Sequence, residues 1–205
     1  MTSNDKRLYL IDAYAMIFRG YFAFIKNPRI TTKGINTSAI FGFTNSLIEL
    51  IKRDRPTHLA VVFDVGRTNV RHDDYAEYKA NRLETPEPIL LAKPFINSIL
   101  EAMHIPILGV EGYEADDVIG TLAVMAARQG INVVISSGDK DLSQLVDAHT
   151  TVIDTMNGKK RDVAGVTAEF GVPPPLMVDF QALVGDAVDN VPGVPKVGAK
   201  TAAKW

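Results

Sequence analysis

The chain has 205 residues, of which 46% are hydrophobic and 22% charged, and its 22 Lys and Arg against 24 Asp and Glu give a formal net charge of −2. This is the composition of a globular protein, and it excludes a disordered, collagen-like or coiled-coil chain. The absence of cysteine excludes disulfides, thiolate nucleophiles and cysteine-ligated metals, so we expect any bound metal to be a hard cation.

Short β-prone runs alternate with helix-like segments along the chain. The runs cover residues 8–11, 59–63 and 131–135, and the helix-like segments cover residues 38–52, 89–103 and 115–128. This alternation predicts an α/β fold with a central, mostly parallel sheet flanked by helices on both faces. Ligands of such sheets bind at the carboxyl ends of the strands.

Acidic residues follow each of the three predicted strands, and two later segments, EGYEADDVIG and VGDAVDN, contribute more. The nine acids that can meet at one sheet edge are Asp12, Asp64, Glu114, Asp116, Asp117, Asp139, Asp141, Asp186 and Asp189. Carboxylates held about 3–6 Å apart repel one another and need a compensating cation. Ligands that are all oxygen atoms indicate Mg²⁺ or Mn²⁺.

Each acid also has a simpler interpretation, because an Asp after a strand is often a turn residue or a helix N-cap. Capping does not require doublets such as DD and DKD, so the repeated pattern favours a site. An EF-hand beginning at Asp139 is excluded, since that loop needs Gly at its sixth position and Glu at its twelfth, where this chain has Gln144 and Thr150.

Setting the nine acids aside leaves 15 acidic residues against 22 Lys and Arg, a balance of +7. A basic surface around bound cations suits a phosphodiester substrate.

The stretch from residue 66 to residue 94 is too polar for a core and contains three prolines, which predicts an insertion that stands off the sheet and is helical in part. If residues 70–83 form a helix, one face carries Arg71, Tyr75, Tyr78, Lys79 and Arg82. Cations that bind phosphates, together with aromatic rings that stack on bases, are typical of a channel for a single strand. A solvated charged helix anchored by its two Tyr is the alternative.

The segment NVPGVPKVGAKTAAKW predicts a hairpin around Gly193 and Gly198, with Lys196 and Lys200 close to the helix that follows. Backbone N–H groups of such a turn can approach a phosphate closely. A turn that is merely stiffened by proline is the alternative.

The four histidines lack zinc spacing, and the absence of GxSxG and P-loop motifs argues against a serine hydrolase or a P-loop enzyme.

Six segments occur along the chain in an order typical of one family: LYLIDAY, THLAVVFD, YAEYKANR, EGYEADDVIGTLA, SGDKDLSQL and LVGDAVDNVPGVPKVGAKTA. The chain resembles the flap endonuclease family of PIN-like nucleases, in particular the 5′-nuclease domains of bacterial DNA polymerases I. The resemblance implies a PIN-like fold with a helical arch, and a structure-specific 5′-3′ exonuclease and flap endonuclease that hydrolyses DNA with two Mg²⁺ or Mn²⁺ ions. It also implies a role in primer or flap removal during replication and repair.

The resemblance assigns roles to individual residues. It places Asp64, Glu114 and Asp116, with Asp12 through water, at a first metal site, and Asp139, Asp141, Asp186 and Asp189 at a second. Asp117 becomes a supporting acid, and Lys79 and Arg82 become catalytic arch residues that contact the scissile phosphate. The expected DNA-binding residues are Arg71, Tyr75, Tyr78, Lys79, Arg82, Gly193, Lys196, Gly198 and Lys200, the last four in a helix-hairpin-helix that usually holds a monovalent cation such as K⁺.

The resemblance divides the chain into two parts. We expect a PIN-like core over residues 1–175, with the arch at about 66–94, and a helix-hairpin-helix over 176–205 that is incomplete because the family domain continues beyond Trp205. The expected partner is DNA with a 5′ flap, a nick or a 5′-ended duplex, bound by a monomer, and a polymerase domain can be present in the parent protein. No apolar run approaches the ~20 residues that span a bilayer, so we expect no membrane contact and a cytoplasmic location.

Two other functions are compatible with parts of this pattern. A PIN-type ribonuclease would share the acidic cluster without needing the hairpin. A DNA-structure-binding module that has lost catalysis would keep the hairpin, but the full set of acids counts against it.

Overall fold

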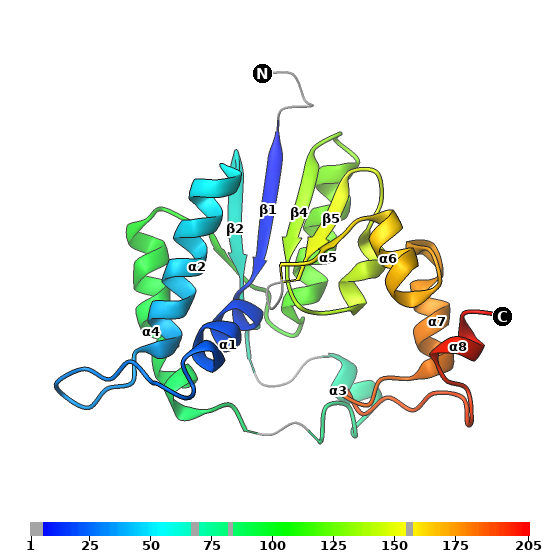
Figure 1. The fold of residues 1–205 in the computed structure, drawn as a ribbon, viewed down its shortest axis with the longest axis horizontal. Coiled ribbons are helices and arrows are strands. Elements are labelled where there is room, and N and C mark those ends of the chain that lie inside the picture. Colours follow the sequence, from blue (N-terminus) through cyan, green and yellow to red (C-terminus); the bar gives the residue numbers. More distant parts are fainter. Residues whose placement is uncertain (1–5, 67–69, 82–83, 155–157) are drawn as a thin grey trace.

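The computed structural model describes residues 6–66, 70–81, 84–154 and 158–205, and a six-stranded sheet forms its centre (Figure 1). The strands are β1 (Arg7–Asp12), β2 (His58–Val62), β3 (Ile107–Leu108), β4 (Asn132–Ser136), β5 (Thr150–Ile153) and β6 (Lys160–Arg161). Their order in the sheet is β3-β2-β1-β4-β5-β6, and only β6 runs antiparallel to its neighbour. The predicted α/β class with a mostly parallel sheet is confirmed.

The pairing register aligns the carboxyl ends of the three central strands. Asp12 of β1 pairs with Val62 of β2, and Ile11 of β1 pairs with Ser136 of β4. The strand order reverses at β1, because β2 lies on one side of it and β4 on the other. Loops that follow these three strands therefore leave from one edge of the sheet, where α/β proteins bind ligands.

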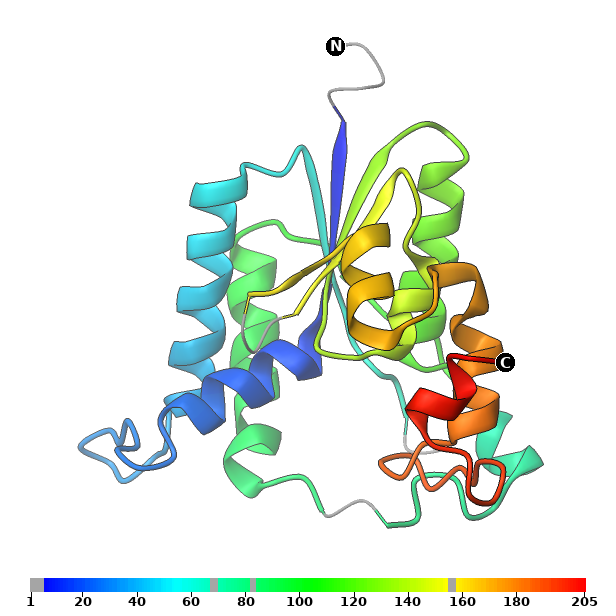
Figure 2. The same cartoon turned by 45° about the vertical axis from the view of Figure 1, so that its right-hand side comes forward.

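Helices cover both faces of the sheet (Figures 1 and 2). One face packs against α1 (Ala13–Ala23), α2 (Ser38–Asp54) and α4 (Glu87–Ala102), and the other packs against α5 (Ala115–Ala127), α6 (Val163–Phe170) and α7 (Met177–Val184). A hydrophobic core lies on each face of the sheet, and alternate residues of β1 pack into the two cores. Tyr9 and Ile11 pack on the α1–α2–α4 side, and Leu10 packs on the α5–α7 side. A strand buried on both faces explains why its sequence is almost continuously apolar.

The predicted strands and long helices are confirmed with small shifts at their ends. Pro94 lies inside α4, which nevertheless continues to Ala102. Outside these elements, the short helices α3 (Val70–Asp74) and α8 (Ala199–Ala202) and the 3-10 turns η2 (Asp141–Leu145) and η3 (Pro174–Leu176) complete the described chain. None of the helices within the described ranges is long and apolar enough to cross a membrane.

The prediction of one helix over residues 70–83 is wrong at residues 75–81, and residues 82 and 83 lie outside the described part of the chain. Helix α3 ends at Asp74, the chain then continues in turns, and Lys79 adopts a left-handed backbone conformation with a φ of 58°. Arg71, Tyr75, Tyr78 and Lys79 therefore do not share one helical face. Residues 70–81 instead lie against the loop that follows α7, on the opposite side of the sheet edge from α4 (Figures 1 and 2).

Candidate active site

Four carboxylates gather where β1, β2 and β4 end. Asp12 follows β1 and caps α1, Asp64 follows β2, Asp139 follows β4, and Asp116 lies in the first turn of α5. The Ala115 N–H donates to Asp64 Oδ1 at 2.9 Å, which ties the start of α5 to the end of β2. The register of the central strands thus brings acids from distant parts of the sequence to one place.

Burial perturbs two acids of this group, and their carboxylate neighbours add to the effect. Burial raises the pKa of Asp116 to about 8, and the nearby carboxylates of Asp12, Asp139, Asp64 and Glu114 contribute to the same shift. Burial also raises the pKa of Asp12 to about 6, against hydrogen bonds from the Ala15 N–H and Ser137. Such shifts mark carboxylates that are held close together without compensating charge.

A second acidic group lies beside the first. Asp141, Asp186 and Asp189 each place a carboxylate oxygen within 4.8 Å of the others. Burial raises the pKa of Asp141, and the neighbouring Asp139 raises it further. Asp139 is therefore electrostatically coupled to both groups, so the two acidic groups form a continuous cluster.

Helix α5 begins with a capping box that orients two more acids. Glu114 is the N-cap residue and accepts from the N3 backbone, while the Glu114 N–H donates to Asp117 Oδ2 at 3.0 Å. Arg71 forms two hydrogen bonds to the Asp117 carboxylate, at 2.7 and 2.8 Å, and this contact lowers the pKa of Asp117. Asp117 is thus engaged by Arg71 and the helix start.

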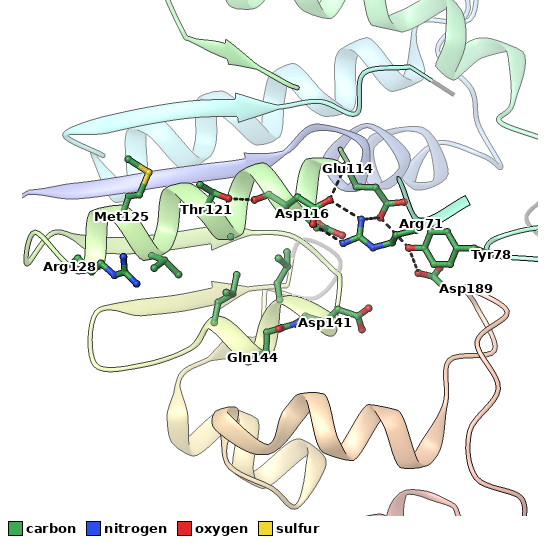
Figure 3. Close-up of a pocket in the computed structure, with 15 residues that line it drawn as sticks. Arg71, Tyr78, Glu114, Asp116, Thr121, Met125, Arg128, Asp141, Gln144 and Asp189 are labelled. Carbon is green, nitrogen blue, oxygen red and sulfur yellow. Dashed lines mark hydrogen bonds and ion pairs between the residues drawn. The ribbon is translucent and has the colours of Figure 1, made fainter. Parts of the chain in front are cut away.

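The basic segment, residues 70–81, places the side chains of Arg71 and Tyr78 among these acids (Figure 3). Lys79 Nζ lies 2.7 Å from Glu114 Oε1 and 3.8 Å from Asp189 Oδ2. The Tyr78 hydroxyl donates to Glu114 Oε2 and lies at hydrogen-bonding distance from Asp189 Oδ2, at 3.2 Å in each case. Burial and these two carboxylates raise the pKa of Tyr78, so its hydroxyl remains a donor at neutral pH. Arg71, Tyr78 and Lys79 are therefore brought to the acidic cluster, although not by a shared helical face.

A cleft of about 560 Å³ extends from the cluster along α5. Glu114, Asp116 and Asp189 line one end of it, and Met125 and Arg128 line the other (Figure 3). The cleft gives solvent and extended ligands access to the carboxylates.

The remaining predicted site residues lie outside the cluster. Tyr75 is exposed, and its hydroxyl donates to the Asn190 carbonyl at 3.3 Å. The hairpin residues Gly193, Lys196, Gly198 and Lys200 lie between α7 and α8 or at the start of α8, and Lys196 and Lys200 are exposed. Arg82 lies outside the described residues.

Three polar residues that support the acids were missed from the sequence. Ser137 Oγ donates to Asp12 Oδ2 at 2.7 Å and accepts from the Asp139 N–H at 3.1 Å. Lys140 Nζ lies 3.0 Å from Asp186 Oδ2, and Gln181 donates to Asp141. Ser137 lies two residues before the DKD motif and Lys140 is its middle residue, so their positions were an available signal, whereas Gln181 reaches the site only through tertiary packing.

Two family models together match residues 7–205. The model of the 5′-3′ exonuclease N-terminal resolvase-like domain matches residues 7–171, and that of the 5′-3′ exonuclease C-terminal SAM fold matches residues 172–205. The 5′-3′ exonuclease of Aquifex aeolicus is 45% identical over 197 residues, covering 96% of this chain and 68% of the relative. The DNA polymerase I of Pseudomonas aeruginosa is 46% identical over 195 residues, covering 95% of this chain. The chain spans 21% of the length of this DNA polymerase I and 23% of that of the Bacillus caldotenax DNA polymerase I.

Solved structures from bacteriophage T5 share the fold. The T5 5′-exonuclease with divalent metal ions (zinc) bound superimposes with a TM-score of 0.77 at 20% identity, covering 97% of this chain and 74% of the other. The T5 flap endonuclease in a pseudo-enzyme-product complex with DNA and metal ions gives a TM-score of 0.75 at 19% identity, with the same coverage of both chains.

Proposed function

The chain belongs to the 5′-3′ exonuclease family and is a nuclease domain of that family, and we propose that it acts on DNA as a structure-specific 5′-3′ exonuclease and 5′-flap endonuclease. Removal of primers or flaps during replication and repair is the corresponding cellular role. The observation that carries the proposal is the acidic cluster itself. Carboxylates from the ends of three parallel strands, the start of α5 and the loop after α7 meet beside a cleft that also contains Arg71 and Tyr78.

The cluster fits divalent metal ions. Its donors are carboxylate oxygens, which Mg²⁺ and Mn²⁺ prefer. Asp116 retains a pKa of about 8 in the absence of an ion, so a cation that binds there displaces a proton and relieves the repulsion from Asp12, Asp139 and Asp64. Repulsion between close carboxylates destabilises the metal-free protein, and a bound cation turns this repulsion into attraction.

We assign two metal positions within the cluster. Asp64, Glu114 and Asp116, with Asp12 through water, would hold one ion, and Asp139, Asp141, Asp186 and Asp189 would hold the other. Asp117 supports the first position by fixing the start of α5 and by pairing with Arg71. Bound divalent ions would supply a more acidic attacking water and positive charge for the phosphate in the transition state.

Side chains of the basic segment are proposed to contact the substrate. Lys79 and Tyr78 bring a cation and a hydroxyl donor to the carboxylates, where they can bind the non-bridging oxygens of a phosphodiester. Arg82 is proposed to act with Lys79 on the scissile phosphate. Tyr75 remains exposed, which leaves its ring free to stack on an unpaired base.

The partner that suits this arrangement is DNA with a 5′ flap, a nick or a 5′-ended duplex. The complex of the T5 flap endonuclease with DNA supports this choice by shared fold. The hairpin between α7 and α8, with Lys196 and Lys200, is proposed to contact the duplex, and K⁺ is the monovalent ion expected at it.

The DNA polymerase I relatives support a polymerase domain in the parent protein and a cytoplasmic location, where bacterial DNA is found. A monomeric state is also proposed.

A substrate panel tests the proposal. The chain is incubated with Mg²⁺ and one of three labelled substrates: a 5′-flap duplex, a blunt duplex or single-stranded RNA. We expect cleavage at or near the flap junction and slower release of short products from the blunt 5′ end. Preferential cleavage of single-stranded RNA would contradict the proposal and would identify a ribonuclease. Binding of the flap without cleavage in Mg²⁺ and Mn²⁺ would identify a binding module.

A further inference from the structure

Several hydrogen bonds join the basic segment to the acidic loop after α7 across more than 100 positions of sequence, and three of them involve residues 77, 79 and 81. The Lys79 N–H donates to the Asp189 carbonyl at 2.9 Å. The Asn190 side-chain amide donates to the Glu77 carbonyl at 2.8 Å, and the Asn81 amide donates to the Ala187 carbonyl at 2.8 Å. The two Asn side chains thus reach in opposite directions across the contact, one from each segment.

The backbone at this contact is strained. Lys79 and Asn190 both adopt the left-handed region, with φ of 58° and 59°. Asn tolerates this conformation, whereas Lys rarely adopts it. Strain of this kind persists only where surrounding contacts impose it, and it concentrates at functional positions. At Lys79, hydrogen bonds to the loop after α7 are made by its own N–H and by the neighbouring Glu77 carbonyl and Asn81 amide.

The strained conformation determines where the Lys79 side chain lies. Its ammonium reaches Glu114 and Asp189, and the side chain is 15% exposed. The side-chain amides of Asn81 and Asn190 both donate to backbone carbonyls. Their effect on the acidic cluster therefore acts through the placement of the segment that carries Lys79.

We propose that Asn81 and Asn190 are positioning residues that clamp residues 75–81 onto residues 186–191, so that Lys79 is delivered to the carboxylates that bind the substrate phosphate. This inference rests on the proposed function. It adds to that function a fixed geometric link between the basic segment and the loop that contributes Asp186 and Asp189. Neither Asn is needed to bind metal or to contact the phosphate.

The first test uses the metal-free chain and does not depend on catalysis. The variants are Asn81→Ala and Asn190→Gly, the latter because Gly accepts a positive φ and so removes the amide without adding strain. Exposed Asn27 in the α1–α2 loop provides the matched control Asn27→Ala. Amide hydrogen exchange is followed in peptides that cover residues 75–81 and 186–191.

Each clamp variant should increase exchange about tenfold in both segments, including the one that keeps its Asn, with β1 and β4 still protected. Trypsin cleavage after Lys79 should accelerate by a similar factor, whereas Asn27→Ala should behave as the wild type. Unchanged exchange at residues 75–81 in both variants would overturn the clamp. Loss of protection throughout the sheet would also overturn it, because the two Asn would then stabilise the whole fold.

The second test separates positioning from general stability by a double-mutant cycle. Single-turnover cleavage of the flap duplex is measured at saturating enzyme and Mg²⁺. Asn81→Ala should slow cleavage about tenfold in the wild-type background and have almost no effect in a Lys79→Ala background, with flap affinity unchanged in both. Equal losses in the two backgrounds would overturn the positioning role. If the wild-type chain cuts none of the substrates, the proposed function fails, and the exchange experiment still decides whether the clamp exists.

Discussion

Lys79 Nζ lies 2.7 Å from Glu114 Oε1, and both side chains are largely shielded from solvent. The ion pair links the basic segment to the N-cap of α5, next to the most strongly perturbed carboxylate in the cluster, Asp116. A fixed cation here offsets part of the carboxylate repulsion before any metal ion binds. The same ammonium is also placed where a phosphate bound at the cluster would meet it.

Replacing Lys79 by Ala should therefore have opposite effects on metal binding and on cleavage. Loss of the positive charge should tighten Mn²⁺ binding several-fold. The single-turnover rate should fall by about 10²–10³, the range found when one electrostatic stabiliser is removed. Titration calorimetry and rapid-quench kinetics measure the two quantities.

Lys52→Ala is the matched control, since it removes one exposed positive charge from the last turn of α2. It should leave both quantities unchanged. Weaker Mn²⁺ binding in Lys79→Ala, combined with a normal cleavage rate, would contradict the role assigned to Lys79.

Removing a carboxylate from the cluster should stabilise the metal-free protein at neutral pH. The folded pKa of Asp116 is raised to about 8, from an ordinary value near 4, so between these values the folded state holds a proton that the unfolded state has lost. The free energy of unfolding therefore falls as pH rises from about 4 to about 8. Asp116→Asn removes this loss and should raise the free energy of unfolding by about 2 kcal/mol or more at pH 8, since each pKa unit corresponds to about 1.4 kcal/mol.

Thermal or urea unfolding in EDTA across this pH range measures the effect. The advantage of Asp116→Asn should shrink toward zero near pH 4, and Asp179→Asn, on an exposed part of α7, should show no such trend. An Asn variant that is less stable than the wild type at pH 8 in EDTA would show that the carboxylates are not in conflict.

Most of the sheet and its acidic edge could be predicted because the signals are local. The apolar runs at residues 8–11, 59–63 and 131–135 have the length and residue types of buried strands, and Asp12, Asp64 and Asp139 follow them directly. Parallel strands share a carboxyl edge, so convergence follows from the topology once the strands are recognised.

The conformation of the basic segment could not be predicted in this way. A helical pattern was present around Arg71, Tyr78 and Lys79, but ion pairs and hydrogen bonds to residues 35 to 111 positions away determine the observed turns. Helix propensity is a weak preference that tertiary contacts override. The Asn81 and Asn190 contacts are also long-range and leave no periodic signal.

The second acidic group should hold its own metal ion. Asp186 has a lowered pKa although burial acts to raise it, because Lys140 and the Val188 N–H donate hydrogen bonds to its carboxylate. Asp186→Asn should remove the weaker of two Mn²⁺ binding events, or weaken it at least tenfold, while the other remains. Titration followed by Mn²⁺ electron paramagnetic resonance counts the bound ions. Loss of both ions together would show that the cluster acts as a single site.

The hairpin between α7 and α8 depends on a close backbone approach. Gly185 has a φ of 75°, and a Cβ added to it would overlap the backbone N of Gly193. Gly185→Ala should therefore destabilise the hairpin by about 2 kcal/mol or more and weaken binding of duplex DNA. Gly130→Ala, between α5 and β4, is the control, since Gly130 has a similar φ of 71° but a Cβ there meets no atom within 4 Å. Equal duplex affinity in both variants, measured by fluorescence anisotropy at fixed salt, would contradict the assignment of the hairpin to DNA.

The dependence of flap cleavage on the metal ion and on Asp116 tests the central claim most directly. Single-turnover cleavage of a labelled 5′-flap duplex is measured for the wild type and for Asp116→Asn, in Mg²⁺ and in EDTA, with folding checked by circular dichroism. We predict rapid cleavage only for the wild type in Mg²⁺, and a rate at least about 10²-fold lower for the folded Asp116→Asn variant. Near-normal cleavage by the wild type in EDTA, or by Asp116→Asn in Mg²⁺, would contradict the account.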